Sequence, residues 1–239
     1  MMKVAVLTGA SRGIGLAIAK RLINLGYKVY GLSRFWENTG FSHENFVHIR
    51  CDVQDTGKLA EAIKHIEKEE PEIHLLINNA GVGYFGPHEQ IPQKGIQAMV
   101  RTNLEAPLVL CQLLLRTLKR NRGTIISISS ITAKKISTHG CAYAATKAGL
   151  SHFFNSLFEE VRKYGVKVAT IHPDITKTSF YDNLDFTYDD DREAALLPEQ
   201  IADAVEYVLK AGDNLVVNDI TLRPQINRIK RKAGNKVDS

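Results

Sequence analysis

The chain has 239 residues, 44% of them hydrophobic and 24% charged, and a formal net charge of +5. This length is typical of one domain that buries about three-quarters of the surface of its unfolded chain. No apolar run approaches the ~18–20 residues of a membrane span, and three widely spaced cysteines indicate neither a disulfide framework nor a metal site. We expect a cytoplasmic protein without a signal peptide, because the N-terminus enters a predicted strand at once.

Strand and helix patterns alternate along almost the whole chain. Short apolar runs predict strands over residues 4–7, 28–32, 46–50, 73–77, 124–128, 166–171 and 215–222. Apolar positions at helical spacing predict helices over residues 16–25, 59–69, 95–119, 143–164 and 198–210. Pro107 predicts a kink or a break within the third helix. The alternation predicts an α/β fold, a Rossmann-like doubly wound parallel sheet with helices on both faces, in a single domain over residues 1–239.

A glycine-rich turn joins the first predicted strand to the first helix. The turn presents Gly9, Ser11, Arg12, Gly13, Ile14 and Gly15. Glycines allow a tight turn and the close approach of a phosphate, and the free N–H groups at the start of a helix attract negative charge. A strand, such a turn and a helix form the opening of a dinucleotide-binding unit. Taken alone, the same turn also serves as a structural connection.

The second predicted strand ends at Ser33 and Arg34, about twenty residues after the glycine turn. A carboxylate at this place holds the ribose hydroxyls of NAD, whereas an arginine suits the 2′-phosphate of NADP. Ser33 can donate a hydrogen bond to that phosphate, Arg34 can form a forked pair with it, and Arg12 lies in the facing turn. The alternative is that both arginines are ordinary surface cations.

Two further strand ends offer contacts to a dinucleotide. Asp52, with the amide of Val53, can accept from an adenine amino group, although a turn-forming aspartate has the same pattern. Asn79, Ala80 and Gly81 follow the fourth predicted strand, next to the first, and allow a ligand to approach closely.

A serine, a tyrosine and a lysine follow the fifth predicted strand. Ser130 ends this strand, and Tyr143 and Lys147 lie four residues apart at the start of a helix, so they share one face. A free tyrosine has a pKa of about 10 and is a poor base at neutral pH, but a nearby ammonium favours its phenolate. The three residues therefore predict a general acid/base site, in which Lys147 lowers the pKa of Tyr143.

This ordered set of motifs resembles the short-chain dehydrogenase/reductase family over about residues 3–210. The resemblance implies that Tyr143 is the general acid/base, that Ser130 polarises the substrate oxygen, and that Lys147 holds the nicotinamide ribose. It further implies that Asn103 anchors a water for a proton relay, that Pro173 and Thr178 contact the nicotinamide end, and that the cofactor is NADP(H). One departure is Asp174, which stands where the family usually has a glycine after Pro173.

The expected function is reduction of a carbonyl to an alcohol, or the reverse, by an NADPH-dependent oxidoreductase. The alternatives are a non-catalytic NADP-binding regulatory protein and an epimerase or dehydratase of the same superfamily. The resemblance implies a homodimer or homotetramer that acts on a small molecule, and neither a nucleic acid nor a membrane is an expected partner. Residues 179–197 are predicted to be a substrate lid, and the basic residues of 223–239 a solvated tail.

Overall fold

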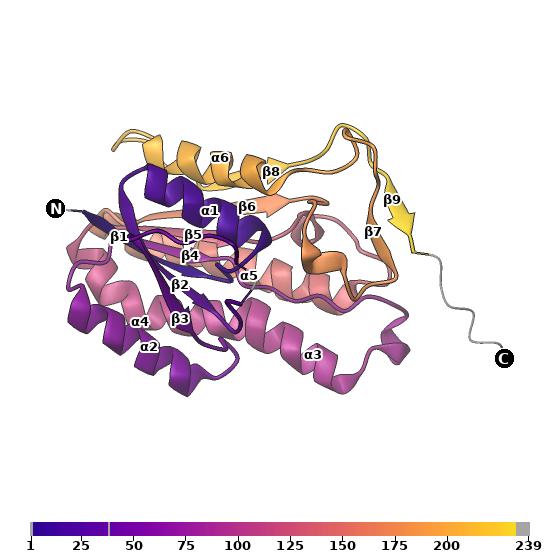
Figure 1. The fold of residues 1–239 in the computed structure, drawn as a ribbon, viewed down its shortest axis with the longest axis horizontal. Coiled ribbons are helices and arrows are strands. Elements are labelled where there is room, and N and C mark those ends of the chain that lie inside the picture. Colours follow the sequence, from indigo (N-terminus) through magenta and orange to yellow (C-terminus); the bar gives the residue numbers. More distant parts are fainter. Residues whose placement is uncertain (1, 38, 233–239) are drawn as a thin grey trace.

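The computed structural model describes residues 2–37 and 39–232. Its main feature is a seven-stranded parallel sheet in the order β3-β2-β1-β4-β5-β6-β8 (Figure 1). The strands are β1 (Lys3–Thr8), β2 (Tyr27–Ser33), β3 (Phe46–Arg50), β4 (Leu75–Asn78), β5 (Thr124–Ile128), β6 (Lys167–Pro173) and β8 (Asp219–Leu222). The strand order reverses between β1 and β4, which is where a doubly wound sheet opens a ligand crevice. The prediction of a Rossmann-like fold is confirmed.

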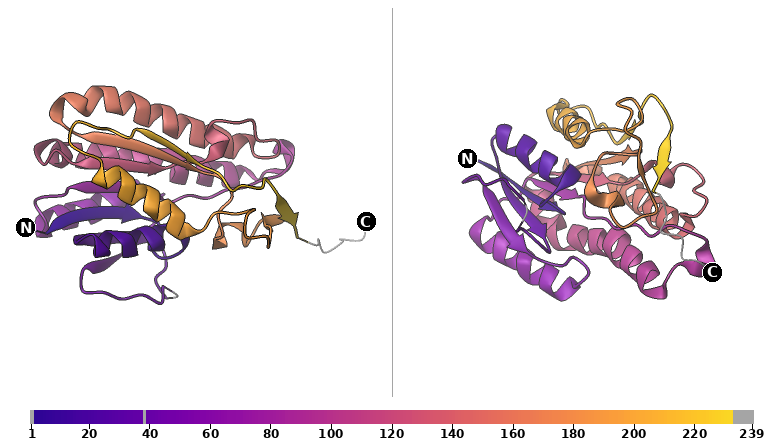
Figure 2. Two further views of the ribbon diagram at one scale, coloured as in Figure 1. Left: turned by 90° about the horizontal axis from the view of Figure 1, so that it is seen from above. Right: turned by 45° about the vertical axis from the view of Figure 1, so that its right-hand side comes forward.

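Helices cover both faces of the sheet, as Figure 2 shows. The helices α1 (Gly13–Asn24) and α6 (Pro198–Lys210) pack on one face. The helices α2 (Thr56–Glu69), α4 (Ala106–Arg120) and α5 (Cys141–Val161) pack on the other. Successive side chains of a strand point to opposite faces, and in β4 Leu75 and Ile77 join the α1–α6 core while Leu76 joins the other. Short 3₁₀ turns lie at His88–Gln90, Ile131–Ala133, Arg162–Tyr164 and Ser179–Tyr181.

The helix predicted over residues 95–119 is divided by a π-helical turn. The helix α3 (Gln93–Val100) leads into the π turn Arg101–Glu105, and α4 follows without a gap. The N–H of Ala106 donates to the carbonyl of Arg101, five residues back. Pro107, the next residue, has no N–H to offer to the carbonyl of Asn103, so it disfavours α-helical bonding over this turn. The interruption predicted from Pro107 is therefore a change of helical register rather than a break.

The combined helix Gln93–Arg120 is long and apolar enough to cross a membrane by length and composition, contrary to what the apolar runs of the sequence suggested. Buried core helices satisfy the same two criteria. Here the α4 part packs in the core through Leu110, Cys111, Leu114 and Leu118. The length and composition of this helix are therefore weak support for a membrane span.

The segment predicted as a solvated tail pairs with the predicted lid. The short strands β7 (Phe186–Tyr188) and β9 (Ile229–Arg231) form an antiparallel ribbon, which stands apart from the main sheet (Figure 1). Ion pairs add to this pairing: Arg228 contacts Asp189 at 3.0 Å and Asp191 at 2.7 Å, and Lys230 contacts Asp190 at 2.5 Å. Residues 227–232 are exposed to solvent, as a solvated tail would be, but they are held against the lid because their charges complement its acidic run. Residues 233–239 of that tail lie outside the described residues.

Candidate active site

One large cleft of about 1270 Å³ lies at the carboxyl ends of the sheet strands. Every residue that the sequence places at the site borders this cleft, except Asn103. The cleft runs from the ends of β2 and β3, past the glycine turn, to Ser130 and Tyr143 and then to the β7–β9 ribbon. A single continuous cleft thus connects the predicted dinucleotide contacts with the predicted acid/base residues.

The glycine turn has the backbone conformation and the space that a phosphate needs. Gly9 and Gly13 have φ of +67° and +54°, in the left-handed region that disfavours other residues. A Cβ on Gly15 would lie 2.0 Å from the carbonyl oxygen of Gly9, so only glycine fits there. Among the described residues no side chain caps the amino end of α1, and its first turn holds no acidic residue. These features fit the pyrophosphate of a dinucleotide, since the helix N–H groups face the cleft.

Asn79 holds the glycine turn in place from the end of β4. Its side-chain amide donates to the carbonyl oxygens of Thr8 at 2.9 Å and Gly9 at 3.2 Å. In return the Thr8 hydroxyl accepts from the N–H groups of Asn79 and Ala80, both at 3.0 Å. Asn79 therefore joins β1 to β4 as well as bordering the cleft.

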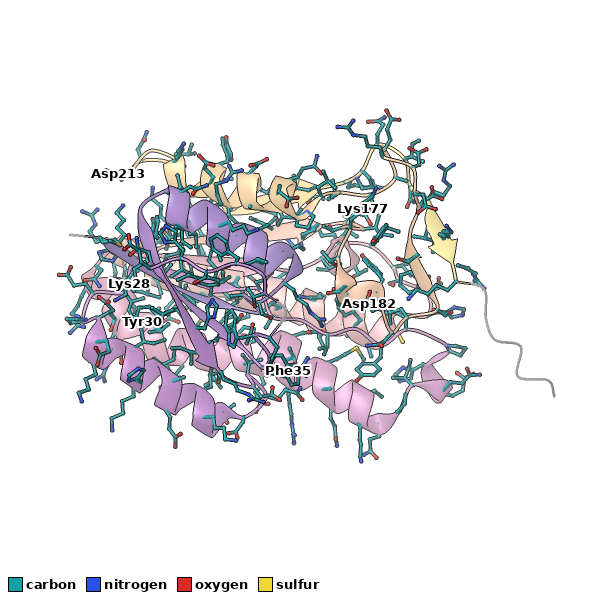
Figure 3. All side chains as sticks on the ribbon, in the orientation of Figure 1. Lys28, Tyr30, Phe35, Lys177, Asp182 and Asp213 are labelled. Atoms are coloured by element: carbon teal, nitrogen blue, oxygen red, sulfur yellow. The ribbon has the colours of Figure 1, made fainter. Side chains whose placement is uncertain are left out.

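The end of β2 presents a hydroxyl and an arginine to the cleft. The Ser33 hydroxyl accepts from the N–H of Ser11 at 3.1 Å, and its own proton stays available to donate. Arg34 is exposed, and its guanidinium carbon lies 5.9 Å from the centroid of the Phe35 ring. Phe35, which is labelled in Figure 3, also borders the cleft. Glu37 also borders the cleft; its carboxylate accepts from the N–H of Trp36, and such backbone hydrogen bonds lower its pKa and keep it ionised. The side chains that Ser33 and Arg34 present suit a phosphate.

Asp52 serves a structural purpose and borders the cleft as well. Its carboxylate accepts from the N–H of Gln54 at 3.1 Å, which is an Asx turn. The turn places the buried Val53 beside it, at the end of β3. Both interpretations of Asp52 from the sequence are thus compatible with its position.

Tyr143 and Lys147 face the cleft from successive turns of α5, and both are buried. The ammonium of Lys147 donates to the carbonyl of Ile128 at 3.0 Å and lies 5.9 Å from the centroid of the Tyr143 ring. Burial lowers the pKa of Lys147 to about 8. Burial raises the pKa of Tyr143 to about 12, opposed by a hydrogen bond with Ser130. This direction is opposite to the one predicted from the lysine, because desolvation of the phenolate outweighs attraction.

Asn103 lies behind the cleft wall, in the π turn. Its side-chain amide exchanges two hydrogen bonds of 2.9 Å with the main chain of Val82 and donates to the Thr146 hydroxyl at 3.1 Å. The Thr146 hydroxyl in turn donates to the carbonyl of Tyr143 at 2.7 Å. Asn103 therefore links the loop after β4 to the turn of α5 that carries the tyrosine.

Asp174, the departure from the family pattern, joins three segments at one end of the cleft. Its carboxylate is largely buried, accepts from the N–H of Ile175, and lies 3.6 Å from Lys135 and 3.5 Å from Arg223. Thr178 lies nearby, with its methyl group 3.2 Å from where a Cβ on Gly13 would be. The loop after β6 therefore reaches across to the glycine turn, with Asp174 as its anchor.

An aromatic wall surrounds Tyr143, and no motif in the sequence indicated it. The ring centroids of Phe85 and Phe180 lie 5.1 Å and 5.9 Å from that of Tyr143. Phe186 lies 5.2 Å from Phe85 and extends this wall to the ribbon. The aromatic richness of residues 180–188 was the only signal, and it did not show which rings meet the tyrosine.

A buried histidine behind Ser130 also lacked a signal in the sequence. The Nδ1 atom of His172 lies 3.2 Å from the carbonyl oxygen of Ser130, and its Nε2 atom lies 3.1 Å from the Asp219 carboxylate. Burial lowers the pKa of His172 despite this carboxylate. The contacts fix the end of β5 against β6 and β8, and so they fix the Ser130 backbone.

Comparison with known proteins agrees with this geometry. The family model for short chain dehydrogenases matches residues 3–188. A probable NADP-dependent dehydrogenase of Haemophilus influenzae is 30% identical over an alignment of 234 residues that covers 92% of each chain. An alcohol dehydrogenase of the archaeon Thermococcus sibiricus, solved with 5-hydroxy-NADP, is similar with a TM-score of 0.84 and 26% identity, covering 95% of this chain and 99% of that one. A metagenomic short-chain oxidoreductase in complex with NADP gives a TM-score of 0.78 at 29% identity and covers 94% and 97%. The chain therefore belongs to the short-chain dehydrogenase/reductase family.

Proposed function

We propose that the protein reduces a carbonyl compound to an alcohol, or catalyses the reverse reaction, as an NADP(H)-dependent oxidoreductase. The observation that carries this proposal is the meeting of Ser130, Tyr143 and Lys147 in the same cleft as the glycine turn. The cofactor is NADP(H): Arg12, Ser33 and Arg34 supply donors for a 2′-phosphate, and the H. influenzae relative is named as NADP-dependent.

In this proposal the chain binds, orients and protonates the substrate. When bound, the nicotinamide supplies the hydride. The hydroxyls of Ser130 and Tyr143 donate to the carbonyl oxygen, and Tyr143 gives up its proton as the oxygen becomes an alkoxide. A pKa of about 12 keeps Tyr143 protonated at neutral pH, as a proton donor must be. Lys147, with a pKa of about 8, is still mostly an ammonium there and stabilises the phenolate that Tyr143 becomes.

Asn103 contributes through its main chain in this proposal. Its side chain is already committed to Val82 and Thr146. Its carbonyl has lost its α-helical donor, because Pro107 has no N–H. A water held by that carbonyl is the start of the relay that returns a proton to Lys147.

The proposal is tested by the oxidation of NADPH and NADH with a panel of ketones and aldehydes. We expect turnover of at least one carbonyl class and at least a ~10²-fold loss of kcat in Tyr143→Phe, since the ring stays and only the acid is lost. The affinity for NADPH, measured by fluorescence, should be unchanged in this variant. Near-normal kcat in Tyr143→Phe would remove the tyrosine from the mechanism. NADPH binding without turnover of any carbonyl or alcohol would favour a regulatory protein, and a product at the oxidation level of the substrate would favour an epimerase or dehydratase.

The family resemblance also leads us to propose a homodimer or homotetramer in the cytoplasm, with the long helices α4 and α5 as the contact. Sedimentation velocity at micromolar concentration tests the oligomeric state, and a monomer would contradict it.

A further inference from the structure

The C-terminal strand borders the active-site cleft. Asn227, Ile229 and Arg231 line it beyond the aromatic wall of Tyr143. These residues alternate along the chain, as expected for one face of an extended strand. The ladder of β9 with β7 fixes this register by pairing Arg231 with Phe186 and Ile229 with Tyr188. The segment that leads into β7, with Lys177 and Asp182, lies on the same side of the molecule (Figure 3).

The residues between them point the other way and hold the ribbon together. Arg228 pairs with Asp189 and Asp191, and Lys230 pairs with Asp190. The ammonium of Lys232 donates to the carbonyls of Tyr181 and Asp182 at 2.6 Å and 2.8 Å. Within residues 2–37 and 39–232, these contacts occupy the carboxylates of Asp189, Asp190 and Asp191, and no carboxylate forms an ion pair with Arg231.

The space between Tyr143 and Arg231 is walled by aromatic rings. Phe85 contacts the ring of Tyr143, Phe186 contacts Phe85, and Phe186 is the ladder partner of Arg231. A molecule whose carbonyl reaches Tyr143 therefore meets an apolar wall first and a guanidinium after it. Guanidinium groups bind carboxylates and phosphates in a forked geometry.

We propose that the C-terminal segment is the outer wall of the substrate site and that Arg231 selects carbonyl compounds with an apolar body and an anionic group at the far end. The inference rests on the proposed carbonyl reduction and adds the class of its substrate. Asp185 also borders the cleft, one residue before β7, and its carboxylate would favour a cation instead. The Arg231 side favours an anion, because the ammonium of Lys232, bonded to the carbonyls of Tyr181 and Asp182, brings a second positive charge to this end of the ribbon. The N–H of Lys232 donates to the main-chain carbonyl of Asp185, which ties this charge to the start of β7.

The test compares 4-acetylbenzoate and 3-(4-acetylphenyl)propanoate with their neutral methyl esters, using NADPH. We expect kcat/KM to be about 10-fold higher for the better acid than for its ester, as a charge-assisted contact at an exposed position allows. Arg231→Gln should remove most of this preference by raising KM for the acid. It should change kcat/KM for the ester much less. Lys230→Ala is the matched control, because it removes a neighbouring cation from the opposite face of β9. It should keep the acid-to-ester ratio.

Calorimetric binding of the same acids and esters to the NADPH complex separates this inference from the proposed function. An acid that binds through Arg231 but is not reduced would support the anion site and contradict the reductase. Reduction of acids and esters with equal kcat/KM, or equal loss for both in Arg231→Gln, would overturn the anion selection and leave the reductase. A preference for the corresponding 4-acetylbenzylamine, lost in Asp185→Asn, would overturn it in favour of a cationic substrate.

Discussion

At the scale of single residues, the site contains buried ionisable groups, and burial disfavours the charged form of each. Lys147 is the clearest case, because its pKa falls from an ordinary 10.5 to about 8 while its ammonium donates to only one carbonyl, that of Ile128, within the described part of the chain. At pH 7 this displacement corresponds to roughly 3 kcal/mol of lost stability. Such a cost is expected where function requires a buried charge.

Lys147→Met should therefore stabilise the fold while abolishing activity. The Ile128 carbonyl loses its donor in the variant, so we expect a net gain of about 1–2 kcal/mol in the free energy of unfolding at pH 7. Between pH 8 and 10.5 Lys147 of the wild type is protonated in the unfolded chain but deprotonated in the folded protein. The free energy of unfolding of the wild type therefore rises with pH over that window. The extra stability of Lys147→Met over the wild type should therefore become smaller as the pH rises. Urea denaturation at pH 7 and pH 10 measures it, with the exposed Lys163→Met as control; a gain that does not depend on pH would contradict the buried charge.

We expect cofactor choice to depend on two residues at the end of β2. Ser33→Asp keeps an acceptor for the N–H of Ser11, binds ribose hydroxyls and repels a 2′-phosphate. Combined with Arg34→Leu, it should change a ~10²-fold preference for NADPH into a preference for NADH, since two charge-assisted hydrogen bonds are lost. The ratio of kcat/KM values for the two cofactors measures this. Arg50→Leu, at the paired end of β3 but outside the cleft lining, should leave the ratio unchanged. A wild type that prefers NADH would contradict the assignment.

At the scale of elements, the helices and strands of the sheet were predictable because each buries its own apolar pattern. The strand predicted over residues 46–50 coincides with β3, and the helix over 198–210 with α6. The π turn was not predictable, because Pro107 signals an interruption without its form. The aromatic wall around Tyr143 was also not predictable, since it brings together Phe85 and Phe186 from distant segments. Motif spacing reports local geometry, whereas these contacts depend on the packing of loops.

The glycine turn can be tested by comparing two Gly→Ala variants that gain the same intrinsic helix propensity. Gly15 and Gly149 both lie inside helices, so Ala at either position gains about 0.5–1 kcal/mol from propensity. A Cβ on Gly149 would lie 3.6 Å from Leu104, an ordinary contact, whereas on Gly15 it would lie 2.0 Å from the Gly9 carbonyl. Gly149→Ala should therefore raise the midpoint of thermal unfolding slightly. Gly15→Ala should lower it by several degrees and weaken NADPH binding at least tenfold. Differential scanning fluorimetry with and without NADPH measures both, and equal behaviour of the two variants would contradict a close approach at Gly15.

At the scale of the whole molecule, the chain divides into a sheet with two large cores and a ribbon with little buried surface. The central strands β1, β4 and β5 contribute fully buried side chains to both cores. The ribbon of β7 and β9 has only partly buried and exposed residues. Sequence alone could not place the tail on the lid, because pairing between residues 186–188 and 229–231 needs the sheet to bring them together. The opposite charges of residues 189–191 and 228–232 were nevertheless a usable signal.

This difference in burial predicts that the ribbon opens without unfolding of the sheet. A two-stranded ribbon is marginal by itself, and exposed ion pairs contribute about 0–1 kcal/mol each. The N–H groups of Ile226 and Lys232 donate to the main-chain carbonyls of Glu193 and Asp185. They should therefore exchange with deuterium far faster than the N–H groups of β4 and β5. Because salt screens the pairs of Arg228 and Lys230, 0.5 M NaCl should speed ribbon exchange several-fold and leave the central strands unchanged. Arg228→Ala with Lys230→Ala should exchange fast at low salt and lose the salt response. Ribbon amides as protected as those of β5, or indifferent to salt in wild type, would show that the ribbon is held by something other than its charges.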